Sequence, residues 1–438
     1  MGKVLNVLWL LLTVFAANCW LAVTENLWCL LPAVGGFLAA NVLAGAFDRS
    51  LPERWMRICR HGQACLRLFL FSTVVSVGYH AVMAFYLLPG RKWDWIISAA
   101  VCVCVEAVVF WNGIISIYCT SRQIGIKYRV IGVVCGLIPV ANLVVLGLLL
   151  QIVRIELDLE REKHRINMLR QEEQVCRTKY PLLLVHGVFF RDFKYFNYWG
   201  RIPAELERNG ATVYYGEHQS AAAVADSARE LTNRIRHIVE TTGCEKVNII
   251  AHSKGGLDCR YAIAHLGAAP YVASLTTVNT PHRGCMFADH LLWKIPENIK
   301  NKVAQTYNAV LRKLGDPAPD FMAAVTDLTA WGCREFDALP TPEGIYCQSV
   351  GSVMKYARTG KFPMNLSYHL AKKFDGPNDG LVAESAFCWG QDYTLVTTEG
   401  KRGISHGDMI DLNRENICDF DVREFYVGLV SRLRLRGL

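Results

Sequence analysis

The amino-acid sequence predicts two parts, an all-α transmembrane domain over residues 1–153 and a doubly wound α/β domain with a mostly parallel sheet over residues 179–438. Nearly continuous apolar blocks fill the first part, and they raise the apolar content of the 438-residue chain to 52%. Strand and helix patterns alternate in the second part. One of its strands runs into a serine that stands between small residues.

The apolar blocks contain five segments of about 20 residues, the length that crosses the hydrocarbon core of a bilayer. Tryptophan and tyrosine residues lie near the segment ends, as they do at membrane interfaces. The predicted spans are 4–23, 27–47, 66–88, 95–119 and 130–153. A cleaved signal peptide is an alternative for the first span, and a buried helical core is an alternative for all five.

Basic residues in the short loops predict the orientation. If the spans alternate, most of these residues fall on the N-terminal side, which is then cytoplasmic. They are Lys3, Arg49, Arg54, Arg57, Arg60, Arg122 and Lys127, against Arg91 and Lys92 on the other side. Five spans predict an integral protein of the cell membrane whose C-terminal domain lies outside the cytoplasm. The basic residues after 153 favour the opposite side, and four spans would reverse the prediction.

Charge and cysteine content exclude several classes of protein. The net charge is +8, and the basic residues form no long stripe with interleaved aromatics, so nucleic-acid binding is not expected. Loops that face anionic headgroups explain the excess better. The 16 cysteines are divided equally between residues 1–153 and the rest, without a Cys-x-x-Cys pair, which disfavours a zinc ribbon. Their spacing dictates no disulfide pairs, and nothing predicts an oligomeric state.

A charged helical linker is predicted over residues 154–178, because apolar residues recur there at helical spacing among dense mixed charge. Strands are then expected at 181–185, 212–215, 246–251, 272–278 and 393–397, and helices at 202–209, 222–240 and 256–266. This order is typical of a doubly wound sheet, whose active site lies at the carboxyl ends of the strands.

Ser253 is the candidate nucleophile. The β-branched run that ends at Ala251 and His252 meets the serine at once, and Gly255 and Gly256 follow it. Small neighbours are needed where a sharp turn from strand to helix pushes a serine outward while backbones pass closely on either side. The pattern is the alanine variant of the G-x-S-x-G nucleophile elbow.

A serine hydroxyl needs a base, and the base needs an acid to orient it. In the chain order of this kind of fold the acid and then the base follow the serine. Asp379 in an Asn-Asp-Gly turn and His406 in a glycine-bracketed loop have the expected positions. The rival acids are Asp375, Asp392 and Asp408, and the rival bases are His369 and His282. Position relative to the predicted strand ends favours Asp379 and His406.

Two backbone amides are expected to hold the anion that forms on the substrate carbonyl. Lys254, directly after the serine, supplies the first. Val188 supplies the second, because Gly187 lets the chain turn sharply after an early strand. His186 and His252 are interpreted as structural residues that bond to backbone.

Six segments in this order resemble the secreted bacterial triacylglycerol lipases of the Pseudomonas and Burkholderia type, which are α/β-hydrolases. The segments are 180–187 (YPLLLVHG), 197–203 (NYWGRIP), 247–253 (VNIIAHS), 280–284 (TPHRG), 378–382 (NDGLV) and 405–406 (SH). The resemblance runs from about Lys179 to the C-terminus. It implies a catalytic triad of Ser253, Asp379 and His406, with oxyanion amides at Val188 and Lys254.

The chain also departs from this family. The resemblance implies a calcium ion near the histidine loop, held by two aspartates, and Asp408 matches one of them. No acidic residue lies between 351 and 374 to supply the other, although a hard cation requires more than one carboxylate. No organic cofactor is required. The membrane domain lies wholly outside the resemblance.

A helical lid is expected over about 285–340, with amphipathic helices at 287–295, 299–314 and 321–331. In the lipase interpretation these helices cap the acyl pocket near the lipid interface, and a plain helical insertion is the alternative. Exposed apolar surface distinguishes the two. One predicted apolar stripe consists of Val303, Tyr307, Val310, Leu311 and Leu314.

The sequence therefore predicts a membrane-anchored serine hydrolase that cleaves carboxylic esters of lipids, with a lipid or acyl-ester substrate and the bilayer as its partners. An acyltransferase or thioesterase on the same triad is an alternative. A membrane protein with an inactive hydrolase domain is another. Within the apolar segments, Glu106 and His80 are ionisable candidates for a functional role, and helix packing is the alternative role for Glu106.

Overall fold

The computed structural model describes residues 2–45, 48, 50–136, 138, 140–188, 197–219, 221–313 and 315–438. Three residues used in the sequence predictions lie outside the described residues: Phe47 at the end of the second span, Arg49 in the basic cluster and Leu314 in the lid stripe. The chain divides into two compact units, Met1–Met168 and Leu169–Leu438.

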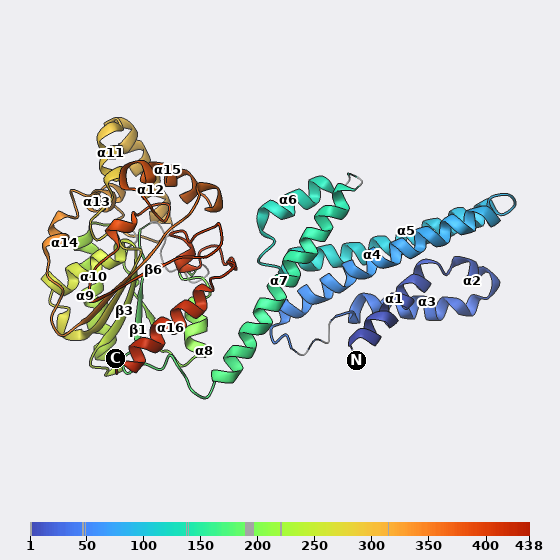
Figure 1. Ribbon diagram of the computed structural model, residues 1–438, viewed down its shortest axis with the longest axis horizontal. Helices are drawn as coiled ribbons and strands as arrows, with labels where there is room; N and C mark the ends of the chain where they lie inside the picture. Colours follow the sequence, from blue (N-terminus) through green and yellow to red (C-terminus); the bar gives the residue numbers. More distant parts are fainter. Residues whose placement is uncertain are drawn as a thin grey trace. The chain divides into compact units, whose positions relative to one another are not determined.

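The N-terminal unit is helical throughout its described elements. Two long helices, α4 and α5, pack along each other as a hairpin (Figure 1). The elements are α1 (Gly2–Ala17), α2 (Trp20–Glu25), η1 (Leu27–Cys29), α3 (Leu30–Leu43), α4 (Arg54–Leu87), α5 (Lys92–Thr120), α6 (Gly125–Cys135) and α7 (Ala141–Arg170), the last of which ends in the second unit.

Two of the five predicted spans have the length and composition to cross a membrane. Among the described residues these are α4, with 34 residues, and α5, with 29. The first predicted span is divided between α1 and α2, because Asn18 ends α1 and its side-chain amide donates to Val14 O and Ser76 Oγ, both at 2.8 Å. The span 27–47 is shortened to η1 and α3, and 130–153 is divided between α6 and α7. In the part of the chain that the structure describes, only the third and fourth predicted spans are therefore continuous helices.

The predicted linker is helical at its start, but it is not a separate element. Residues 154–170 continue α7 without a break, so the change in composition near Arg154 falls inside a helix. Ion pairs one turn apart line its surface. Arg165 contacts Glu162 at 2.6 Å, as the spacing predicts, and Arg161 contacts Asp158 at 2.7 Å.

The second unit contains a six-stranded sheet in the order β2-β1-β3-β4-β5-β6, with every pair of neighbours parallel. The strands are β1 (Leu182–Val185), β2 (Val213–Tyr215), β3 (Val247–His252), β4 (Val272–Val278), β5 (Tyr346–Ser352) and β6 (Asp392–Val396). The first four and β6 lie where the sequence predicts strands, whereas β5 is not predicted. The strand order reverses between β1 and β3. In open α/β sheets, ligands bind at the carboxyl ends of the strands where the order reverses.

Helices cover both faces of this sheet (Figure 1). The main ones are α8 (Ile202–Arg208), α9 (Val224–Thr242), α10 (Lys254–His265) and α16 (Val422–Leu435). A further helix, α15 (Met364–Asp375), packs on Met354 in a separate cluster. Shorter segments are η2 (Ala269–Tyr271), η3 (Ala357–Thr359), η4 (Glu384–Ala386) and η5 (Asp408–Ile410). Four further helices, α11 to α14, lie between β4 and β5 and are described with the site.

The alternation of side chains along the strands builds one core on each face. Leu182 and Leu184 of β1 belong to a cluster with Tyr426 of α16. Leu183 and Val185 point to the opposite face and belong to a cluster with α9 and α10. Because both faces are covered, β1 is apolar at every position, as parallel strands of this kind are.

Candidate active site

Ser253 lies in the sharp turn between β3 and α10. Its backbone has φ 55° and ψ −130°, a conformation that residues with a side chain rarely adopt. Backbone strain of this kind persists only where the surroundings hold it, and it gathers at functional sites. The turn that the sequence predicts is therefore present, with the serine at its corner.

Close contacts explain why the neighbours of Ser253 are small. A side chain at Gly255 would overlap the carbonyl of His186, and one at Gly256 would overlap the side chain of Thr280. A Cβ at Gly187 would lie 2.8 Å from the Cβ of Ser253. The loop after β1 and the turn after β3 thus approach each other as closely as backbone allows.

The structure brings together the acid and the base that the sequence predicts. His406 Nδ1 lies 2.6 Å from Asp379 Oδ2, and the main chain adds a bond in which His406 N donates to Asp379 O at 2.9 Å. Asp379 follows α15, and His406 follows β6. Both residues are buried, so this pair is shielded from bulk water.

Both carboxylate oxygens of Asp379 accept hydrogen bonds from neighbouring groups. Its Oδ1 accepts from the amides of Leu381 at 2.9 Å and Val382 at 2.8 Å. Its Oδ2 also accepts from Asn279 Nδ2 at 2.6 Å. The sequence predictions missed Asn279, although it directly follows β4 at the same edge of the sheet. These bonds orient the carboxylate toward His406.

The rival residues have other partners. Asp375 accepts from the first amides of α11, and Asp392 accepts from Tyr346 and from Arg436. His282 lies 3.1 Å from Arg260 and 2.9 Å from Thr277 Oγ1, and His369 is a residue of α15. The position of each supports the choice of Asp379 and His406.

The two predicted oxyanion residues lie beside the serine. Lys254 is the first residue of α10, where backbone amides have no intrahelical acceptor and the helix dipole is positive. Its side chain turns away into the core, where Nζ donates to Asp258 Oδ1 at 2.6 Å and to Ser227 Oγ at 3.0 Å. Val188 is buried in the loop after β1. Residues 189–196 beyond it lie outside the described residues.

A chain of hydrogen bonds beneath the site joins three of its loops. The amide of Gly187 donates to the hydroxyl of Tyr198 at 3.0 Å, and that hydroxyl lies 2.7 Å from His252 Nδ1. His252 Nε2 lies 3.2 Å from the carbonyl of His406. A neutral ring with its proton on Nε2 satisfies both contacts. His252 is thus a structural residue, as predicted.

His186 has a similar environment. Its ring nitrogens lie 2.9 Å from the carbonyl of Gly187 and 3.1 Å from the carbonyl of His218, and its ring stacks on that of His218 at 4.0 Å. These contacts agree with the structural role predicted for it.

An apolar cavity of about 320 Å³ opens beside Ser253, His406 and Val188. This volume lies within the range of small-molecule sites. Its remaining wall is almost wholly apolar and comes mainly from the region between β4 and β5. These residues are Pro281, Cys285, Phe287, Ala288, Leu291, Leu292, Ile295, Ile299, Lys300, Val303, Phe321, Met322, Val325, Leu328, Leu381 and Val382.

The wall helices match the predicted lid region. They are α11 (Met286–Lys294), α12 (Glu297–Lys313) and α13 (Phe321–Asp327), followed by α14 (Arg334–Ala338). Large apolar side chains on their outer surface are exposed, including Trp293 at 82% and Met286 at 57%. Ile299 and Val303, at 49% and 42%, are half exposed while they also line the cavity. Such exposed apolar surface is the feature that separates a lid from a plain insertion.

Asp408, the predicted calcium ligand, already has a cationic partner. Both of its oxygens lie 3.1 Å from the guanidinium of Arg402, and Oδ2 accepts from the amide and hydroxyl of Ser405. Arg402 also contacts Glu415 at 3.0 Å. With the second aspartate missing and an arginine in contact with the first, the residues present do not fit a calcium ion.

A parallel sheet with a strained serine turn after its third strand, and with a buried histidine and aspartate pair at the same edge, defines an α/β-hydrolase. Comparison with known proteins agrees. Residues 210–315 match the family described as "Putative serine esterase (DUF676)". The triacylglycerol lipase of Vibrio cholerae serotype O1 is 31% identical over 296 residues, which cover 61% of this chain and 91% of that lipase.

The triacylglycerol lipase of Pseudomonas fragi is 30% identical over 298 residues, which cover 60% of this chain and 98% of that lipase. The crystal structure of Staphylococcus hyicus lipase aligns with a TM-score of 0.46 at 19% identity, over 59% of this chain and 97% of that one. The chain belongs to the triacylglycerol lipase family and is a carboxylic ester hydrolase.

Two buried histidines should make the hydrolase domain sensitive to acid. Burial lowers the pKa of His252 and of His282 well below the ordinary value, and His406 and Arg260 respectively lower them further. Below pH of about 6.5 these two histidines bind protons in the unfolded chain, but they remain unprotonated in the folded state. The contribution of each of these histidines to the free energy of unfolding should therefore fall as the pH drops, by up to about 1.4 kcal/mol per pH unit.

Urea unfolding between pH 7.5 and pH 5 measures this slope. The variant His282→Gln removes one of the two titrations. Below pH of about 6.5 its free energy of unfolding should therefore depend less steeply on pH, by up to about 1.4 kcal/mol per pH unit, which corresponds to one proton. An unchanged slope in that variant would show that His282 does not contribute.

Proposed function

We propose that this protein is a membrane-anchored serine hydrolase that cleaves carboxylic esters of lipids with a triad of Ser253, His406 and Asp379. One observation carries the proposal: a serine in a strained turn and a histidine that is hydrogen-bonded to a buried aspartate line the same apolar cavity. That cavity is suited to the acyl chain of the ester.

The contacts of His406 assign its role. A carboxylate accepts hydrogen bonds only, so the Nδ1 proton of neutral His406 is donated to Asp379 and Nε2 is left without a proton. Nε2 takes the proton of the Ser253 hydroxyl as its oxygen attacks the ester carbonyl. Asp379 stabilises the imidazolium that forms, and Asn279 keeps the carboxylate in place.

The anion on the former carbonyl oxygen is held by the amides of Val188 and Lys254. A donor that is aimed at the anion in advance contributes about 3 kcal/mol to the transition state. Collapse of the anion expels the alcohol, which receives the proton from His406, and leaves the acyl group on Ser253. Water then attacks the acyl-enzyme with His406 as base, and the same amides hold the second anion.

The helices α11 to α13 act as a lid over the acyl cavity. Their inner residues line the cavity, and their outer surface presents Met286 and Trp293 to the surroundings. An apolar outer surface is suited to a lipid interface, where it loses contact with water. A water-insoluble ester is then reached at the interface and not from solution.

The N-terminal unit anchors the protein, with α4 and α5 crossing the bilayer. Basic residues lie at the start of α4 and after α5, which favours a cytoplasmic location for both ends of this hairpin. We further propose that the hydrolase domain lies outside the cytoplasm. This orientation requires the apolar part of α7 to complete a further crossing, since the hairpin alone returns the chain to the cytoplasmic side.

The triad is tested with a fluorophosphonate probe, which reacts with activated serines. The wild-type protein should be labelled at Ser253, and Ser253→Ala should lose labelling. Asp379→Asn should lower kcat by about 10⁴-fold on a soluble ester, because the histidine loses its orientation. Asp375→Asn is the matched control and should keep the wild-type rate. Loss of turnover in Asp375→Asn with retention in Asp379→Asn would overturn the assignment of the acid.

The side of the membrane is tested with a maleimide that does not cross membranes. Cys418 is exposed on the hydrolase domain, so intact cells should be labelled at Cys418 as strongly as lysed cells. Cys418→Ser identifies the labelled peptide. Labelling that appears only after lysis would place the domain in the cytoplasm, whatever its catalytic activity.

We expect the enzyme to be active without calcium. Because Arg402 pairs with Asp408, removal of calcium with EDTA should change neither the melting temperature nor ester hydrolysis. Arg402→Ala should instead lower the free energy of unfolding by about 2 kcal/mol, since it leaves a buried carboxylate without its cation. A rise in the melting temperature of the wild-type protein on adding calcium would contradict this proposal.

A further inference from the structure

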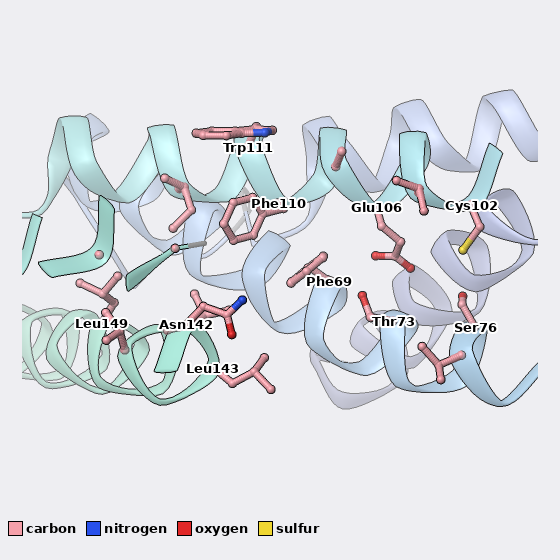
Figure 2. Close-up of a pocket in the computed structure, with 18 of the residues that line it drawn as sticks. Phe69, Thr73, Ser76, Cys102, Glu106, Phe110, Trp111, Asn142, Leu143 and Leu149 are labelled. Atoms are coloured by element: carbon pink, nitrogen blue, oxygen red, sulfur yellow. The ribbon is translucent and has the colours of Figure 1, made fainter. Parts of the chain in front are cut away.

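A second cavity lies within the N-terminal unit. Its volume is about 530 Å³, and residues of α4, α5, α6 and α7 form its wall (Figure 2). This volume is within the range of sites that hold small organic ligands. The cavity lies outside residues 210–315, which match the serine esterase family, and the catalytic mechanism makes no use of it.

The wall is apolar over most of its extent. Phe69 of α4, Phe110 of α5 and Leu149 of α7 are among the residues that line it. Apolar cavities of this size favour apolar occupants, since water in them lacks hydrogen-bond partners. The wall therefore suits an alkyl or acyl chain.

One buried acid interrupts this apolar wall. Glu106 is only 6% exposed, and Figure 2 shows its carboxyl group extending from α5 toward Thr73 on α4. Its Oε2 lies 2.9 Å from Ser72 Oγ, which is itself 2.7 Å from the carbonyl of Leu68. Among the described residues, Oε1 forms no hydrogen bond of good geometry, and the hydroxyl of Thr73, which the carboxyl group faces in Figure 2, is also without a partner.

A buried carboxyl oxygen without a partner costs about 1–3 kcal/mol. Lysine and arginine are missing from the described residues that line the cavity, and its histidine, His80, has no hydrogen-bond partner on either ring nitrogen, so no ion pair among these residues meets this cost. The hydroxyl of Ser72 donates to the carbonyl of Leu68, so Oε2 of an uncharged Glu106 donates to Ser72 Oγ, and Oε1 is an acceptor whether or not the acid is charged. The partner that Oε1 requires is therefore a hydrogen-bond donor. An ester carbonyl or a choline headgroup has no such donor, whereas a hydroxyl group has one.

We propose that this cavity binds a long-chain lipid with a free hydroxyl, a mono- or diacylglycerol, whose hydroxyl donates to Glu106 Oε1 while its acyl chain fills the apolar wall. The choice of a glyceride rests on the proposed function, since hydrolysis of a triacylglycerol produces lipids of this class. The site itself rests only on the cavity and on Glu106.

The experiment uses the full-length protein with Ser253→Ala, so that no probe is hydrolysed, in phosphatidylcholine nanodiscs. Two probes carry the same photoreactive acyl chain, one as a monoacylglycerol and one as a methyl ester. The monoacylglycerol should label peptides of α4 and α5 that line the cavity, and dioleoylglycerol should compete. Glu106→Leu should reduce this labelling about tenfold, the loss expected for one hydrogen bond to a buried carboxyl group.

Matched variants separate recognition from folding. Glu106→Gln keeps an acceptor oxygen and should retain most of the labelling, and the methyl ester should be insensitive to both substitutions. Ala107→Trp fills the cavity, leaves Glu106 in place and should abolish labelling by the monoacylglycerol. Melting temperatures identify any variant that fails to fold.

The proposal would be overturned if the two probes labelled the protein equally, or if Glu106→Leu left labelling by the monoacylglycerol unchanged. Either result would mean that the cavity holds the acyl chains of ordinary bilayer lipids. Stronger competition by sphingosine than by dioleoylglycerol would overturn the hydroxyl assignment in favour of an ammonium group. These outcomes are independent of catalysis. Failure of the proposed function would appear separately, as absence of fluorophosphonate labelling in the wild-type protein.

Discussion

The close approach of two backbones at Ser253 is the constraint on which the rest of the hydrolase domain depends. The serine adopts φ 55°, and the loop after β1 passes so near that only glycine fits at position 187. Gly255 and Gly256 then let α10 begin directly against the neighbouring loops. The strain of this turn is supported by β1, β3 and β4, which are buried on both faces and fix the positions of the strand ends.

The loops of the site are joined to one another as well as to the sheet. Tyr198 and His252 connect the loop of Gly187 to the backbone of His406 through hydrogen bonds that stay buried. Asn279 connects the end of β4 to Asp379. A displacement of one loop therefore changes the position of the histidine, the acid and the oxyanion amide together, which is the precision that a triad mechanism requires.

Two chemically different cavities accompany the two units of the chain. The cavity at Ser253 is apolar beside a reactive serine, and it is suited to the acyl part of an ester. The cavity in the N-terminal unit is apolar around an acid with an unpartnered oxygen, and it is suited to a chain that carries a donor. Under the proposed function the first cavity holds the acyl chain during cleavage, and under the further proposal the second binds a glyceride.

The sequence by itself determined the α/β order, the serine turn, and the positions of Asp379 and His406, because each depends on local features: strand periodicity, small residues around a serine, and polar residues in glycine-containing turns and loops. Only the tertiary structure decided the rest. Asn279 and Tyr198 act through partners distant in sequence, and β5 carries the polar Gln348 and Ser349, which hide its strand pattern. The breaks in the apolar segments arise from contacts such as that of Asn18 with Ser76, which hydropathy does not register.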